Sequence, residues 1–205
     1  MARRNNYLIQ AGQAKARFLT YDHGRLARKL DLAMDEQYIY VNLLCQPYRV
    51  SRATGDLERQ VRGQWTDGNS YEEVMTLLDL LCDSREDRWV SGRWKDMQAF
   101  GNMFHRNLLE DQRDPAAERI QQDVEGFRRA CLALGGQPLA GGDAAYAIEL
   151  ACGLPAALRF WEGDEEFPAR LRFQWDENAC QFIRYETMYF AKALILRRIG
   201  EEMAR

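Results

Sequence analysis

A short motif occurs twice in this sequence, each time shortly before a segment with the apolar periodicity of a helix. Residues 62–65 read Arg-Gly-Gln-Trp, and residues 172–175 read Arg-Phe-Gln-Trp. In both places strand-like residues and a Gly-Asp turn precede the motif, so the order helix, strand, hairpin and helix is repeated. This order predicts two similar halves, at about residues 7–83 and 115–205, joined by an irregular connection at residues 84–114.

Runs rich in β-branched and aromatic residues predict the strands of each half. In the first half, residues 37–45 form one run, and residues 47–65 form two runs joined at a Thr-Gly-Asp turn. In the second half the runs are 144–152, 155–167 and 169–178. Two such units would most simply join their hairpins into one sheet. We therefore predict an α+β fold with one antiparallel sheet flanked by helices, built by internal duplication.

Local signals predict where several helices begin and end. Ser70 and Glu73 have the spacing of a capping box, in which the hydroxyl and the carboxylate each accept a free backbone N–H. Asp114 is followed by Pro115, a pair typical of a helix start. The apolar periodicity after Pro115 predicts one continuous helix that ends at Gly135. A last helix is predicted from about Cys180 to the end of the chain.

The size and charge of the chain narrow the classes of function. A chain of 205 residues suits one domain, residues 1–205, that folds without metal or disulfide support. The net charge of −3 argues against a general nucleic-acid binder. The basic N-terminus lacks the apolar segment of a signal peptide, and no apolar run is long enough for a membrane span. We expect no membrane and no nucleic acid among the partners.

The cysteines and glycines contain none of the common cofactor motifs. The five cysteines include no Cys-x-x-Cys pair, which argues against zinc-finger and iron–sulfur sites. Unpaired thiols in apolar surroundings are typical of a reduced cytoplasm, so we predict a cytoplasmic protein. Walker, Gly-x-Gly-x-x-Gly and Gly-x-Ser-x-Gly patterns are absent from the sequence. The sequence therefore identifies no cofactor and no resident metal.

Five segments resemble a bacterial family known as domain of unknown function 3786. The segments are PYRVSRATGD (47–56), VSGRW (90–94), LGGQPLAGGDAAYAIEL (134–150), LRFWEGDEEFPARLRFQWDEN (158–178) and IRYET (183–187). Together they span nearly the whole chain, and the Trp-x-Gly-Asp-Glu-Glu-Phe-Pro block is the most specific of them.

The resemblance implies a setting but no catalytic residues. Family members occur mainly in anaerobic bacteria, and some join this domain to a cysteine-rich iron–sulfur segment. That implies a link to anaerobic redox or one-carbon metabolism, although this chain contains no such segment. Cys45 stands where the relatives tend to have glycine, at the start of the first hairpin.

Clustered carboxylates are the first candidates for chemistry. Asp164 lies among acidic residues at a predicted hairpin tip, and Asp176 lies at the far end of the next strand. Several carboxylate oxygens can hold Mg²⁺ or Ca²⁺, but an extended strand would keep these two groups far apart. The alternative is a solvated acidic turn in which Asp164 accepts hydrogen bonds from the turn backbone.

Glu186 is the second candidate, because helical spacing places it on one face with Ile183 and Phe190. A buried carboxylate must find a partner or take up a proton, and Arg159 and Arg172 on the preceding strands are candidate partners. Such a carboxylate can serve as a general acid or base. It can equally form a structural ion pair between sheet and helix.

Three hypotheses of function remain open. The leading hypothesis is a non-catalytic ligand-binding or accessory protein that uses the crease between the halves or an aromatic sheet face. Its candidate binding residues are Trp161, Trp175, Arg159, Arg172 and Tyr185. The alternative is a carboxylate- or divalent-metal-dependent enzyme that uses Glu186 with Asp164 or Asp176. In a third hypothesis, the basic N-terminal segment docks an acidic protein partner.

Overall fold

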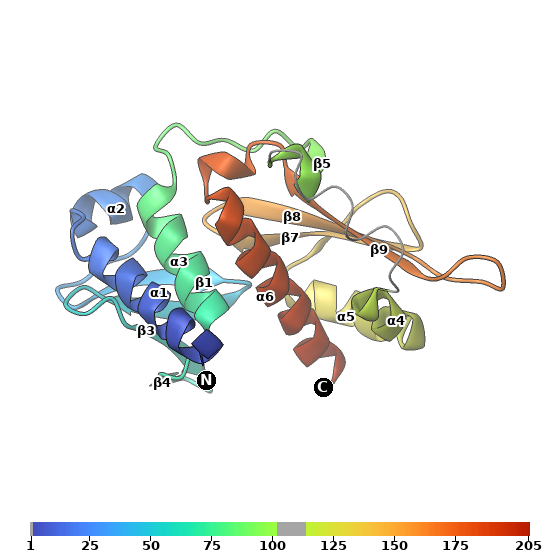
Figure 1. Ribbon diagram of the computed structural model, residues 1–205, viewed down its shortest axis with the longest axis horizontal. Coiled ribbons are helices and arrows are strands. Elements are labelled where there is room, and N and C mark those ends of the chain that lie inside the picture. Colours follow the sequence, from blue (N-terminus) through green and yellow to red (C-terminus); the bar gives the residue numbers. More distant parts are fainter. Residues whose placement is uncertain (1, 102–113) are drawn as a thin grey trace. The chain divides into compact units, whose positions relative to one another are not determined.

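A computed structural model describes residues 2–101 and 114–205 (Figure 1). The chain divides into two compact units, each made of two segments. Unit 1 comprises Met1–Trp89 and Cys180–Leu194, and unit 2 comprises Val90–Ala179 and Ile195–Arg205. The part of the predicted connection between residues 101 and 114 lies outside the described residues. The described residues contain no helix long and apolar enough to cross a membrane.

Unit 1 contains a four-stranded antiparallel sheet in the order β1-β2-β3-β4. Its elements are α1 (Ala2–Phe18), α2 (His23–Leu30), β1 (Tyr38–Leu43), β2 (Gln46–Ser51), β3 (Leu57–Val61), β4 (Gln64–Thr66), α3 (Tyr71–Asp83) and the first part of α6 (Tyr185–Met203). Unit 1 also contains Cys180 and Gln181 of the 3₁₀ helix η3 (Ala179–Gln181). Figure 1 shows α1 and α3 alongside one another over the strands of this sheet. The side chains of this sheet alternate between a buried face and an outer face, as the period of two in a strand requires.

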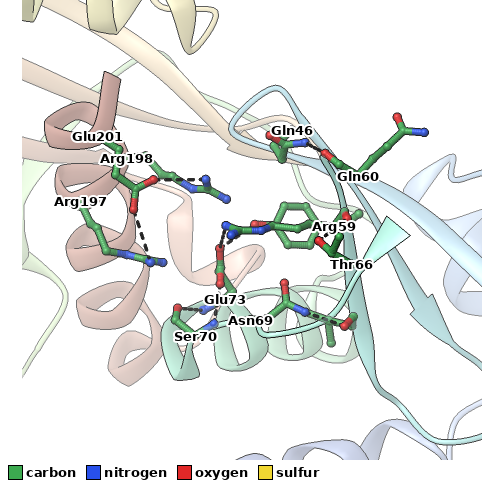
Figure 2. A network of polar contacts seen from close by, with 12 residues as sticks. Gln46, Arg59, Gln60, Thr66, Asn69, Ser70, Glu73, Arg197, Arg198 and Glu201 are labelled. Atoms are coloured by element: carbon green, nitrogen blue, oxygen red, sulfur yellow. Dashed lines mark hydrogen bonds and ion pairs between the residues drawn. The ribbon is translucent and has the colours of Figure 1, made fainter. Parts of the chain in front are cut away.

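A capping box positions α3 against the buried face of the sheet. The Ser70 hydroxyl accepts the Glu73 N–H, and the Glu73 carboxylate accepts the Ser70 N–H at 2.6 Å. Tyr48 on β2 donates to the same carboxylate at 2.7 Å. Figure 2 shows Glu73 between Ser70 and the guanidinium of Arg59, which lies 3.8 Å away. The predicted capping box is therefore confirmed, and its glutamate also links the helix to the sheet.

Unit 2 contains a five-stranded antiparallel sheet in the order β5-β9-β8-β7-β6. Its elements are β5 (Trp94–Asp96), the 3₁₀ helix η1 (Met97–Ala99), α4 (Pro115–Gln122), α5 (Val124–Ala133), β6 (Gln137–Pro138), β7 (Ala144–Ala151), β8 (Leu154–Trp161), β9 (Arg170–Asp176) and the last part of α6. Phe127 on α5 packs against Tyr146 and Phe160, with ring centroids about 6 Å apart in both pairs. Helix α5 therefore covers the apolar face of this sheet.

The α+β class with antiparallel sheets is confirmed, but the prediction of one shared sheet is wrong. The hairpins form two separate sheets. Strands β4, β5 and β6 at the sheet edges have only two or three residues, and short edge strands discourage further pairing. The fourth edge strand is β1. The segment that precedes β1 in the chain lies along this edge, where the Tyr40 N–H donates to Ala33 O at 2.9 Å.

The continuous helix predicted after Pro115 is also wrong. Helix α4 ends at Gln122 and α5 begins at Val124. Asp123 between them has φ −151°, and its carboxylate accepts the Gly126 N–H at 2.7 Å. An aspartate favours such a cap over the helix interior because its short side chain competes for backbone N–H groups.

The repeated Arg-x-Gln-Trp motif does not occupy equivalent strands. Trp65 lies on β4, the last strand of its sheet, whereas Trp175 lies on β9, beside β8, and is fully buried. The first hairpin turns are more alike. Leu44 and Cys45 join β1 to β2, and 152–153 joins β7 to β8, with positive φ at all four residues. Internal duplication stays a prediction that is based on these turns and on the order of elements.

The turn at Leu44 and Cys45 provides a test of local strain. Both residues have positive φ, 51° and 59°, a conformation that costs a non-glycine residue about 1–2 kcal/mol. Cys45 is exposed, so no packing is lost on its removal. We expect Cys45→Gly to raise the free energy of unfolding by about 1 kcal/mol, as measured by urea denaturation.

Cys45→Ala is the matched control, because alanine removes the thiol but keeps the Cβ atom that causes the strain. It should leave the free energy of unfolding near that of the wild type. An equal gain in both variants would show that the thiol, and not the backbone conformation, limits stability.

Candidate ligand-binding site

The outer face of the first sheet carries an unusual group of aromatic and charged side chains. Tyr38 and Tyr40 come from β1, Arg49 from β2, Glu58 from β3 and Trp65 from β4, and all five are half-buried. Antiparallel register places Tyr40 and Glu58 on either side of Arg49. We call these five residues the outer aromatic face.

Arg49 lies at the centre of the outer aromatic face. Its guanidinium carbon is 4.0 Å from the ring centroid of Tyr38 and 4.7 Å from that of Trp65. The guanidinium also donates to the Glu58 carboxylate on the neighbouring strand. Each cation–π contact contributes about 0.5–1 kcal/mol at a partly exposed site. Arg49 thus links its own strand β2 to β1, β3 and β4, and fixes the orientation of both rings.

Asp35 fixes the second tyrosine of this face. Tyr40 Oη donates to Asp35 Oδ2 at 2.6 Å, and the N–H groups of Gln37 and Tyr38 donate to Asp35 Oδ1 at 2.8 and 2.7 Å. The Tyr40 hydroxyl, followed by these backbone groups, holds the pKa of Asp35 below its ordinary value. The same hydrogen bond raises the pKa of Tyr40. The carboxylate therefore stays charged and the tyrosine stays a neutral donor at neutral pH.

A pocket of about 330 Å³ opens beside this face. Its aromatic walls are Tyr40 and Trp65, whose ring centroids are 6.1 Å apart. Its remaining lining residues are Asp31, Leu32, Ala33, Val41, Asn42, Pro47 and Tyr48. The segment after α2 forms one wall because Asp31 ends that helix with a left-handed conformation, φ 54° and ψ 48°.

Two polar side chains of the pocket remain available. Asp31 and Asn42 are both exposed, and no hydrogen bond or ion pair from either side chain is found among the described residues. A concave surface with aromatic walls and a few polar groups is typical of a small-ligand site. The arrangement can stack a flat or rounded group on the rings and hold it through a carboxylate and a carboxamide.

Sequence reasoning did not single out this pocket. The available signal was the alternation of Tyr38, Tyr40 and Asn42 along one strand, which places all three on the same face. Trp65 could not be added to that face from sequence alone, because its strand follows a turn at 62–63 that reverses the chain. Asp31 lies before β1, outside any strand pattern.

The structure gives Asp164 and Asp176 separate structural environments. Asp164 Oδ1 accepts the N–H groups of Glu166 and Phe167 at 2.9 and 2.8 Å, which lowers its pKa. Asp164 therefore forms a solvated acidic turn, the alternative to a metal site that the sequence also allows. It precedes β9, whereas Asp176 is the last residue of that strand. The two carboxylates are not brought together.

Asp176 is fully buried and organises a loop. Its carboxylate accepts the N–H groups of Ser91, Gly92 and Asn178 and the Ser91 hydroxyl, at distances between 2.7 and 3.2 Å. This loop is the Val-Ser-Gly-Arg-Trp segment noted in the sequence. The carboxylate holds it beside the end of β9.

Arg159 and Arg172 are neighbours on β8 and β9. Arg172 forms a bidentate pair with Asp96 at 2.8 and 2.5 Å, which lowers the pKa of that carboxyl. Arg159 donates to Gln174, and to Ala140 O at 3.2 Å. Burial, followed by the charge of Arg172, lowers the pKa of Arg159. The structure brings these two predicted binding residues together on one sheet.

The two tryptophans that are predicted binding residues differ in their exposure to solvent. Trp161 is half-buried at the end of β8. Trp175 is in the core, where its ring packs 5.2 Å from Phe173 and its Nε1 donates to Met97 Sδ at 3.1 Å.

The expected burial of Glu186 is wrong, because Glu186 is exposed. The buried polar residue on this turn of α6 is Thr187, which donates to Asp79 on α3 at 2.5 Å. The inward face of the helix is therefore rotated by about one residue from the predicted face. Tyr185, the remaining candidate, shares a hydrogen bond of 2.7 Å with Tyr189 and raises the pKa of that residue to about 12.

Comparisons with known proteins identify a family but no characterised relative. A family model described as a domain of unknown function (DUF3786) matches residues 22–198. No curated protein and no solved structure matches the chain. Within the described residues, no group of three or more histidine, cysteine, aspartate or glutamate side chains could hold a metal ion.

The contrast between Asp176 and Asp164 yields a stability test. Asp176→Ala leaves the part-buried N–H groups of Ser91, Gly92 and Asn178 without their acceptor, and a hydrogen bond to a charged group contributes about 1.5–3 kcal/mol. We expect this variant to lower the free energy of unfolding by at least about 3 kcal/mol in urea denaturation. Asp164→Ala, in an exposed turn, should cost about 1 kcal/mol or less. Similar small losses in both variants would contradict the structural role of Asp176.

Proposed function

The chain belongs to the family described as a domain of unknown function (DUF3786), and we propose that it is a non-catalytic ligand-binding protein. The observation that carries the proposal is the pocket beside the outer aromatic face. Two aromatic rings form its walls, and the side chains of Asp31 and Asn42, which have no polar partner in the described part of the chain, lie at its surface. These are the elements of a site that selects a small molecule by shape and by a few polar contacts.

The composition of the pocket supports binding over chemistry. Acid–base and nucleophilic catalysis require a reactive group next to a second group that moves its proton. Among the residues that line the pocket, Asp31 has no histidine, cysteine, lysine or second carboxylate beside it. The hydroxyl of Tyr40 is engaged with Asp35. The pKa of Tyr40 is raised and that of Asp35 is lowered by this hydrogen bond, so the proton stays on the tyrosine at neutral pH, which favours binding over proton transfer.

The alternative enzyme, with Glu186 acting together with Asp164 or Asp176, has less support. Asp164 and Asp176 each bind backbone N–H groups, and they lie before and at the end of β9. Glu186 is exposed on α6 and belongs to unit 1, while the two aspartates belong to unit 2. An active site would require a carboxylate free of such structural hydrogen bonds.

We further propose a cytoplasmic bacterial setting linked to anaerobic metabolism. The support is the resemblance to family members from anaerobic bacteria and the content of cysteines without Cys-x-x-Cys pairs. A single domain over residues 1–205, built by duplication of the halves 7–83 and 115–205, is part of the same proposal. The recurring two-residue hairpin turns support the duplication.

The proposed function predicts that small molecules bind at Trp65. Saturation-transfer NMR with a library of neutral, cationic and anionic fragments should give hits with the wild type. Trp65→Leu should reduce the signal of these hits severalfold, because it removes one wall of the pocket. Trp94→Leu, which removes a half-buried tryptophan from the other sheet, is the matched control and should retain the hits.

Two outcomes would contradict the proposed function. One is a set of hits that persists in Trp65→Leu and disappears in Trp94→Leu. The other is a wild type without hits while its thermal unfolding shows a folded protein.

A further inference from the structure

We infer that this pocket takes the head group of an organic cation, and in particular an alkylated ammonium group. The inference rests on the proposed function and specifies the class of ligand. It is carried by three features of the described residues: a cation already held by neighbouring rings, the charge of the pocket wall and the apolar character of the remaining lining.

The outer aromatic face already binds one cation of the chain itself. Arg49 stacks on both Tyr38 and Trp65, which shows that these rings are positioned to receive positive charge. Tyr40 is the neighbouring ring: Arg49 interacts with its hydroxyl, but no cation stacks on its ring face among the described residues. Its ring and the Trp65 indole form the aromatic walls of the pocket. Aromatic walls of this kind attract ammonium groups through the negative faces of the rings.

The charge of the pocket favours a cation over an anion. Asp31 is the one charged residue in the pocket lining, and it has no ion pair among the described residues. The positive charge of the nearby Arg49 is compensated by Glu58 on the adjacent strand. Phosphate and carboxylate ligands are usually bound by arginine, lysine or clustered N–H donors, and the pocket lining contains no arginine or lysine.

The remaining lining favours an alkylated ammonium over a bare one. A primary ammonium directs three N–H donors outward, and the apolar side chains that make up most of the lining cannot accept them. Leu32, Ala33 and Pro47 offer apolar surface that suits methyl groups. A volume of about 330 Å³ accommodates a compact head group.

The test uses choline and its neutral isostere 3,3-dimethyl-1-butanol, which replaces the charged nitrogen by carbon at nearly the same shape. Binding is measured by titration calorimetry with the full chain. The wild type should bind choline at least about fivefold more tightly than the isostere, the discrimination expected when ring faces and a carboxylate both act on the charge.

Two variants separate charge recognition from simple apolar binding. Asp31→Asn keeps the left-handed backbone, which asparagine tolerates, and should weaken choline about fivefold while leaving the isostere unchanged. Trp65→Leu keeps apolar bulk but removes the ring face, and should weaken choline more than the isostere. Trp94→Leu should change neither, and thermal unfolding of each variant shows that it is folded.

The outcomes distinguish this inference from the proposed function. Equal affinity of the wild type for choline and the isostere would overturn the cation preference, while fragment hits that depend on Trp65 would still support a ligand site. Choline binding that is unaffected by both Asp31→Asn and Trp65→Leu would overturn the assignment to this pocket. If, in addition, no fragment hits depend on Trp65, the proposed function is overturned as well.

Discussion

The stacking of Arg49 between Tyr38 and Trp65 is the interaction on which the candidate site depends. Arg49 lies on β2, between β1 and β3, and its ion pair with Glu58 keeps the guanidinium in place. Each contact is worth only about 0.5–1 kcal/mol. Their effect is therefore mainly one of position: they hold the rings at fixed angles, so that a ligand meets a preorganised wall and loses little entropy in ordering it.

This stacking requires the correct strand register, which the first hairpin turn sets. A shift of one residue would move Arg49 to the buried face. The turn keeps its register although Leu44 has a positive φ of 51°, at a cost of about 1–2 kcal/mol. The Leu44 side chain is only 2% exposed, and burial of a leucine contributes about 1.5–3 kcal/mol. The apolar contact thus offsets the local strain, and the strained turn is retained.

Local patterns predicted elements well but could not predict how distant elements meet. The capping box at Ser70 and most strands of both halves follow from nearest-neighbour chemistry and are confirmed, but a turn at 62–63 divides the strand predicted to end at Trp65 into β3 and β4. The prediction of a single sheet was wrong, because the pairing of two hairpins depends on the length of their edge strands and not on composition. The prediction that Glu186 is buried was wrong. Adjacent residues of a helix point about 100° apart, so tertiary packing decides which of two adjacent positions faces the core. The pocket joins Asp31, Tyr40 and Trp65 from three elements, and only the folded register brings them together.

The most direct test of the account is an NMR titration of the indole N–H signals of the protein's five tryptophans with choline. Trp65→Phe identifies the Trp65 signal by its disappearance. The account predicts a saturable shift of the Trp65 signal, with the signals of Trp161 and Trp175 unchanged. Shifts confined to Trp161, or no saturable shift at all, would contradict a cation site beside the outer aromatic face.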